Sequence, residues 1–283
     1  MNFILFVFGL AIGSFINVVS LRFQPGQKLL VGGRSRCPYC QKQLNWYELI
    51  PVLSFIIQKG RCRSCHQKIS FQYPIVEILS GLIFVFVPLR LKIFNPMIHD
   101  SGFMIHVLFW ILIFLLFLLL SIIDFRHYII PDSLNLSLGI LGVILVVVKT
   151  LNPKPSTLRP NFMGYYSSLF TFSNKVWLNH LFGLVFAAFV FWLIIFLSKG
   201  KGMGWGDFKL ACALGLIFGW PDILMVFILS FLLGGLSGII LIILKKKRLK
   251  EAVPFGPFLV LGAALTFFVG FQILNFYFKA FGF

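Results

Sequence analysis

Two aspartates occupy positions that packing alone does not explain. The chain has 283 residues, of which only eight are acidic. Asp124 ends a long apolar run, and Asp207 closes the glycine-rich segment Gly202–Asp207 directly before another apolar segment. An ionisable side chain at membrane depth costs about 2.5–3.5 kcal/mol on insertion scales, so such residues are functional candidates. Two of them at one membrane face indicate an aspartyl protease pair.

The chemistry of such a pair is peptide hydrolysis without a metal or a covalent nucleophile. One carboxylate deprotonates water while the other group protonates the amide, because two aspartates in close contact share one proton. We expect Asp124 just after the C-terminal end of a helix, which favours the protonated form. We expect Asp207 just before a helix N-terminus, which favours the anion. Asp207 is therefore the expected base and Asp124 the expected acid, in a pair that titrates as one unit.

Structural interpretations of these two aspartates remain open. Asp124 is then a residue at a helix end, paired with Arg126 or Lys209, and Asp207 caps a helix after a flexible loop. Asp132, which follows a proline, is interpreted as an ordinary helix cap. The sequence contains no nucleophile elbow, H-E-x-x-H helix or P-loop, which argues against serine hydrolases, zinc metalloproteases and ATPases.

Four cysteines form two C-x-x-C motifs that predict a structural zinc site. The ligands are Cys37 and Cys40 in the first motif, and Cys62 and Cys65 in the second, with residues 41–61 between the motifs. Four thiolates at such spacing fit tetrahedral Zn²⁺. Zinc would also supply folding energy to a small polar insert. A redox pair or vestigial cysteines are the alternatives, and His66 is a spare ligand beside a complete set.

The composition predicts an all-α polytopic membrane protein. Hydrophobic residues make up 59% of the chain and charged residues 12%, far from the average of soluble proteins. The length accommodates about eight transmembrane helices of roughly 20 residues each. The net charge of +17 does not indicate a nucleic-acid partner, because isolated basic residues flank apolar runs as they do in proteins whose partner is membrane lipid.

The predicted organisation has three parts: a first transmembrane helix at residues 1–21, a zinc-binding insert at 22–73 and a transmembrane protease core at 74–283. Gly9 and Gly13 would let a second helix approach the first. The further apolar spans are expected at Pro74–Leu89, Met104–Ile123, Ser133–Val148, Asn179–Leu197, Phe208–Trp220, Asp222–Leu244 and Phe255–Tyr277. The Phe208–Trp220 span is short and glycine-rich, so we expect it to be tilted or barely to span.

The distribution of Lys and Arg predicts the orientation. If the insert is cytoplasmic, 18 of the 25 basic residues face the cytoplasm, namely those in 22–68, 126, 199–209 and 245–250. The positive-inside rule favours this arrangement. It places Asp124 and Asp207 at the same cytoplasmic face and keeps the cysteines in a reducing compartment, where thiols do not form disulfides.

These motifs, in this order, resemble the type IV prepilin peptidase family, and the resemblance covers nearly the whole chain. The matching segments are Gly13–Val18, the paired C-x-x-C insert with Trp46–Ser54, Ile69–Ser70, Tyr73–Glu77, Asp124 with Ile130–Asp132, the GxGD motif in Gly204–Leu210, and Pro254–Leu259.

The resemblance implies Asp124 and Asp207 as catalytic residues. It also implies cleavage of the basic leader of prepilins and pseudopilins of type IV pili and type II secretion, in a bacterial inner membrane. Because this chain keeps all four cysteines, the resemblance further implies N-methylation of the new N-terminus with S-adenosylmethionine. No methyl-donor pocket is recognisable in the sequence.

Two other classes of protein compete with this interpretation. A proton-coupled transporter would relay protons through intramembrane aspartates, but it predicts carboxylates near the bilayer centre rather than at segment ends. A non-enzymatic zinc-bearing scaffold for a secretion machine would retain its function after Asp-to-Asn replacement.

Overall fold

Long helices account for most of the chain. The structure, a computed structural model, describes residues 2–24, 34–94, 101–151, 162–163, 166, 175–200, 202–245 and 253–280. Parts of the basic segments used to predict the orientation, residues 25–33, 201 and 246–250, lie outside these ranges. The long helices are α1 (Asn2–Arg22), α3 (Gln72–Phe94), α4 (Ser101–His127), α5 (Asp132–Leu151), α7 (Val176–Leu197), α8 (Trp205–Phe218), α9 (Asp222–Ile243) and α10 (Gly256–Ala280). Within the described ranges, β-type pairing is limited to two isolated bridges.

Seven of the described helices are long and apolar enough to cross a membrane: α1, α3, α4, α5, α7, α9 and α10. The predicted span at Phe208–Trp220 differs from them. It is α8, which has only 14 residues and is therefore about 21 Å long, against about 30 Å for the hydrocarbon core of a bilayer. The prediction of an all-α polytopic membrane protein is confirmed, with α8 as an additional short helix.

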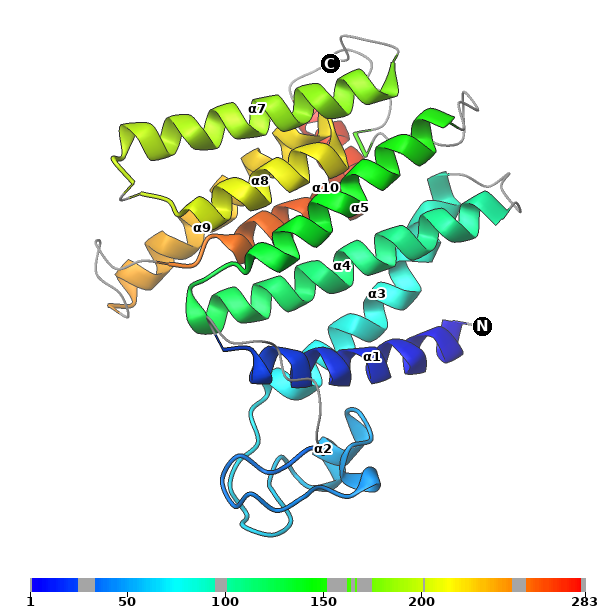
Figure 1. The fold of residues 1–283 in the computed structure, drawn as a ribbon, viewed down its shortest axis with the longest axis vertical. Helices are drawn as coiled ribbons and strands as arrows, with labels where there is room; N and C mark the ends of the chain where they lie inside the picture. Colours follow the sequence, from blue (N-terminus) through cyan, green and yellow to red (C-terminus); the bar gives the residue numbers. More distant parts are fainter. Residues whose placement is uncertain are drawn as a thin grey trace. The chain divides into compact units, whose positions relative to one another are not determined.

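The chain divides into two compact units. The first comprises Met1–Arg90 and Trp110–Leu119, and the second comprises Leu91–Phe109 and Leu120–Phe283. In the first unit, α1 and α3 pack closely (Figure 1). A Cβ atom on Gly9 would lie 2.8 Å from the Cα atom of Gly81, and one on Gly13 would lie 2.7 Å from the Cα atom of Glu77. The predicted role of Gly9 and Gly13 in close helix packing is thus confirmed.

The insert of the first unit is built from two knuckles with the same backbone pattern. A 3-10 turn, η1 (Trp46–Glu48), and a short helix, α2 (Leu53–Ile57), separate them. In each knuckle the N–H of the first cysteine donates to the carbonyl five residues on, and the N–H four residues on donates back, at 2.9–3.0 Å. The latter residue, Gln41 or His66, has a φ of 57° or 56°. Both C-x-x-C motifs are therefore wound so that their two cysteines lie together.

The second unit is arranged around α8. This helix contacts α5, α7, α9 and α10, which Figure 1 colours from green to red. The contact with α7 is close because neither helix carries a side chain where they cross: a Cβ atom on Gly183 would lie 2.7 Å from the carbonyl oxygen of Gly215. Leu210 and Leu214 of α8 are fully buried. A short, buried helix in contact with four others has a well-defined N-terminus, which is where Asp207 lies.

Candidate active site and metal centre

Asp124 lies in the last turn of α4 and not after the helix end, because α4 continues to His127. Its side chain is only 4% exposed. Oδ2 accepts a hydrogen bond from the backbone N–H of Gly256, at the start of α10, at 3.1 Å. A buried carboxylate requires such a donor, since an unsatisfied one is costly. The apolar run thus ends in a carboxylate that a distant segment holds in place.

Asp207 lies in the first turn of α8, three residues after Gly204, so it follows the helix start and does not precede it. Its Oδ2 accepts from the backbone N–H of Gly204 at 3.3 Å. The side chain is half-buried. Burial raises the pKa of Asp207 to about 6, and the hydrogen bond from Gly204 opposes that shift. Asp207 is therefore harder to ionise than a solvent-exposed aspartate.

The side chain of Ile130 lies beside both the GxGD segment that carries Asp207 and the start of α10 that contacts Asp124. A Cβ atom on Gly206 would lie 3.1 Å from Cβ of Ile130, and a Cβ atom on Gly256 would lie 3.1 Å from Cδ1 of the same side chain. The charge of Asp207 acts on Asp124, so the two carboxylates are close enough to interact. Both belong to the second unit. The structure thus brings together the two predicted site residues, although residues 125–206 separate them in the sequence.

The pairing of Asp124 with Lys209, which was one structural alternative for this aspartate, is wrong. Lys209 pairs with Asp132, Nζ to Oδ1 at 2.7 Å, with both side chains exposed. Asp132 is the first residue of α5, close to the expected cap. Asp124 therefore has no lysine partner at Lys209 that would explain it as a simple ion pair.

The glycines of the GxGD segment have less uniform roles than the sequence indicates. A Cβ atom on Gly204 would meet Oδ2 of Asp207 at 3.5 Å, an ordinary contact, whereas Gly206 faces Ile130 at 3.1 Å. Asn135 of α5 donates from Nδ2 to the carbonyl oxygen of Gly206 at 3.4 Å. Sequence reasoning missed Asn135 and the contact role of Ile130. The sequence offered no indication of either residue beyond their closeness to Asp132 in the chain.

The four predicted metal ligands come together in the first unit. The Sγ atoms of Cys37, Cys40, Cys62 and Cys65 all lie within 4.8 Å of one another, and none of these cysteines is in a disulfide. A tetrahedral zinc ion with bonds of about 2.3 Å separates its sulfurs by about 3.8 Å. The Sγ atoms of Cys37 and Cys65 are 3.8 Å apart. The donor set and its spacing therefore fit zinc, and His66 is not part of the cluster.

Comparison with known proteins agrees with this arrangement. Residues 7–91 match the bacterial peptidase A24 N-terminal domain, and residues 110–239 match the type IV leader peptidase family. Three relatives are named prepilin leader peptidase/N-methyltransferase. The Aeromonas hydrophila protein is 31% identical over 97% of this chain and 92% of its own length. The Pseudomonas aeruginosa protein is 30% identical over the same shares. The Bacillus subtilis protein is 29% identical over 98% of this chain and 97% of its own length.

No solved structure matches the chain. The family matches, however, extend across both structural units, and the relatives align over nearly their whole length. Together with seven helices able to span a membrane, they identify the chain as a multi-pass membrane peptidase that belongs to the type IV leader peptidase family.

Proposed function

We propose that this protein removes the basic leader peptide of type IV prepilins and pseudopilins and then N-methylates the new N-terminus. It does so in the bacterial inner membrane, with its active site at the cytoplasmic face. The catalytic pair is Asp124 and Asp207, within a core formed by residues 74–283. The insert at residues 22–73 is held by zinc on Cys37, Cys40, Cys62 and Cys65.

One observation carries the peptidase assignment. Asp124 and Asp207 come from different helices, interact electrostatically, and each is held by one backbone N–H. In both cases the donor binds Oδ2, and Oδ1 has no hydrogen-bond partner in the described part of the chain. Two carboxyl groups with one free oxygen each can share a proton and still present an oxygen to water. This is the requirement of acid–base hydrolysis by an aspartate pair.

The different exposure of the two side chains supports separate roles. Asp207 is half-buried, whereas Asp124 is 4% exposed. The ionised Asp207 takes a proton from water as that water attacks the scissile carbonyl carbon. Asp124 gives its proton to the substrate, so that the peptide bond breaks with a protonated leaving amine. The N–H groups at Gly204 and Gly256 keep the two oxygens in position during this exchange.

A cytoplasmic site suits the proposed substrates. Their positively charged leader stays in the cytoplasm while the following apolar helix enters the bilayer, so the junction lies at the interface. The excess of Lys and Arg in the segments assigned to the cytoplasm supports this orientation. For the second activity, S-adenosylmethionine, when bound, supplies the methyl group that the new amino terminus receives. This half of the proposal is supported by the names of the relatives.

The test is cleavage of a synthetic prepilin-like peptide by the purified full chain in detergent. Asp124→Asn and Asp207→Asn are compared with wild type and with Asp132→Asn. Asp132 is a suitable control because it is an aspartate of the same unit that is exposed and paired with Lys209. We expect cleavage to fall at least about a thousandfold in the first two variants, since each removes one member of an acid–base pair.

Zinc content and melting temperature must stay at the wild-type values in all variants, so that loss of cleavage is not loss of fold. Cleavage that survives in Asp124→Asn or Asp207→Asn refutes the assignment of that residue. If Asp132→Asn alone is inactive, the pair has been placed on the wrong carboxylate. If the wild-type protein cleaves none of several leader peptides that differ in sequence, the peptidase proposal for these substrates is refuted.

A further inference from the structure

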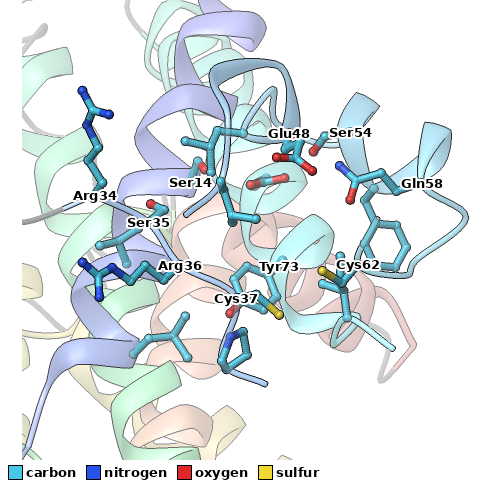
Figure 2. Close-up of a pocket in the computed structure, with 18 of the residues that line it drawn as sticks. Ser14, Arg34, Ser35, Arg36, Cys37, Glu48, Ser54, Gln58, Cys62 and Tyr73 are labelled. Atoms are coloured by element: carbon cyan, nitrogen blue, oxygen red, sulfur yellow. The ribbon is translucent and has the colours of Figure 1, made fainter. Parts of the chain in front are cut away.

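The short helix α2 of the insert turns polar side chains inward and aliphatic side chains outward. Ser54 of α2 and Gln58, its C-terminal cap, line a cavity of about 470 Å³, and Figure 2 shows both side chains in the cavity wall. Leu53, Ile56 and Ile57 do not line this cavity and are 57%, 63% and 67% exposed. A helix on the surface of a soluble domain has the opposite pattern, with its apolar face toward the core.

The three aliphatic side chains of α2 form one face, which we call the α2 face, because they are at positions i, i+3 and i+4. Phe71, which directly precedes α3, lies beside this helix: its ring centroid is 5.3 Å from that of Phe55 of α2. The carbonyl oxygen of Phe71 accepts from the N–H of Ile75 of α3 at 3.2 Å, and both of these side chains are exposed. Phe71 therefore connects α2 to the exposed apolar side chains of α3, a helix able to span a membrane.

The start of α2 lies beside the two spanning helices of the first unit and not beyond their ends. The N–H of Val52, just before α2, donates to Oε2 of Glu77 at 2.8 Å, and Glu77 packs against Gly13 of α1. At 1.5 Å per residue, Glu77 is about 7.5 Å from the start of α3 at Gln72, and Gly13 is about 13.5 Å from the end of α1 at Arg22. An interfacial helix buries its apolar face about 5–10 Å into the boundary between headgroups and acyl chains. The α2 face is therefore at a level where acyl chains can reach it.

Positive charge begins directly after α2. The N–H of Lys59 donates to the carbonyl oxygen of Ile56 at 3.0 Å, and Arg61 forms a backbone bridge with Lys68. These three basic side chains are exposed, and none of them forms an ion pair with another described residue. Glu48 is the only carboxylate side chain among residues 34–71. Such an excess of basic residues next to a membrane attracts anionic lipid headgroups.

We propose that the α2 face is immersed in an anionic phospholipid leaflet, with Lys59, Arg61 and Lys68 at the phosphate headgroups. Trp46 of η1, which contacts α2, is exposed, and tryptophan is favoured at such an interface. A soluble protein would not reach a face at this level of the spanning helices. The proposal requires α1 and α3 to span the membrane, and it does not depend on peptidase or methyl-transfer chemistry. The insert is then held against the bilayer by α2 as well as by the two helices that it connects.

The test maps lipid contact by photo-crosslinking in the full chain. The photoreactive residue benzoylphenylalanine replaces Ile57, or Tyr39 as the matched control, and the protein is reconstituted in nanodiscs of phosphatidylglycerol. Tyr39 is 65% exposed, nearly the same as Ile57, but belongs to a knuckle of the insert and not to α2. After irradiation, mass spectrometry identifies the lipid or protein that is joined to the chain. Zinc content at the wild-type value shows that the insert is folded in each variant.

We expect at least about ten times more lipid adduct at Ile57 than at Tyr39, because the α2 face is the part of the insert in contact with acyl chains. The adduct at Ile57 should fall about twofold or more in nanodiscs of phosphatidylcholine, which has no net charge. A similar fall is expected in phosphatidylglycerol when Lys59→Gln and Arg61→Gln are combined. Lys42→Gln with Arg63→Gln removes the same charge outside the proposed cluster, so this pair should behave as wild type.

Three results would overturn the proposal. Equally low lipid adduct at Ile57 and Tyr39, with normal zinc content, shows that the α2 face is not in the leaflet. An adduct between Ile57 and a second copy of this chain assigns the face to a protein interface. An adduct at Ile57 that is the same in both lipids and in both double variants removes the headgroup role of the basic residues. Failure to cleave leader peptides in the same nanodiscs refutes the peptidase proposal alone, since lipid contact at α2 is measured separately.

Discussion

Replacing Gly256 by alanine should displace the carboxyl group of Asp124 without changing any ionisable residue. A Cβ atom on Gly256 would lie 2.6 Å from Oδ2 of Asp124, and real Cβ contacts essentially never fall below 3.0 Å. The carboxyl must therefore retreat by at least about 0.4 Å, and the 3.1 Å hydrogen bond from the Gly256 N–H is lengthened or lost. A hydrogen bond to a neutral group contributes about 0.5–1.5 kcal/mol, and a misplacement near 1 Å costs about a hundredfold in rate.

We accordingly expect kcat/KM for leader cleavage to fall about 10- to 100-fold in Gly256→Ala. The loss should appear mainly in kcat, because the change displaces a proposed catalytic group. The assay is cleavage of the prepilin-like peptide in detergent over a range of peptide concentrations. Gly235→Ala is the matched control: it makes the same change in a neighbouring helix, α9, where a Cβ atom would meet nothing within 4 Å.

Two glycines of the GxGD segment provide a graded comparison. Gly206→Ala brings Cβ to 3.1 Å from Ile130, so the neighbour must move by a few tenths of an ångström, whereas Gly204→Ala gives an ordinary 3.5 Å contact with Asp207. The expected order of loss is Gly256→Ala, then Gly206→Ala, then Gly204→Ala. Wild-type kcat in a stably folded Gly256→Ala protein would refute this account of how Asp124 is positioned. A larger loss in Gly204→Ala would refute the account of the glycines.

Two further predictions concern protons and metal. Because burial raises the pKa of Asp207 to about 6, the acidic limb of the pH–rate profile should lie near pH 6. Below that pH Asp207 is protonated and cannot act as the base, so kcat/KM should fall about tenfold per pH unit. A limb near pH 4 in a protein with an unchanged circular-dichroism spectrum would contradict the effect of burial. Elemental analysis should find one zinc ion per chain, lost in Cys62→Ser and retained in Cys212→Ser, because Cys212 lies outside the cluster. Equal zinc content in the two variants would rule out the proposed ligand set.

Local sequence determined the features that depend on neighbouring residues. Apolar runs located the seven helices able to cross a membrane, because such a helix must satisfy its own backbone and present apolar side chains along its whole length. The C-x-x-C spacing indicated the cysteine cluster, because each knuckle is held by hydrogen bonds between nearby residues and presents two of the four sulfurs. The two aspartates stood out because carboxylates are rare in such a chain.

Tertiary structure decided how those residues are used. Asp124 accepts its hydrogen bond from Gly256, a residue 132 positions away, and Lys209 pairs with Asp132 and not with Asp124. No local pattern encodes either choice, since both depend on which helix ends meet. The short α8 is stabilised by contacts with four helices, which hydropathy does not register. The side chain of Glu77 is buried where α1 packs closely against α3 at Gly13. The sequence thus determined the kinds of chemical groups, and long-range packing determined their partners.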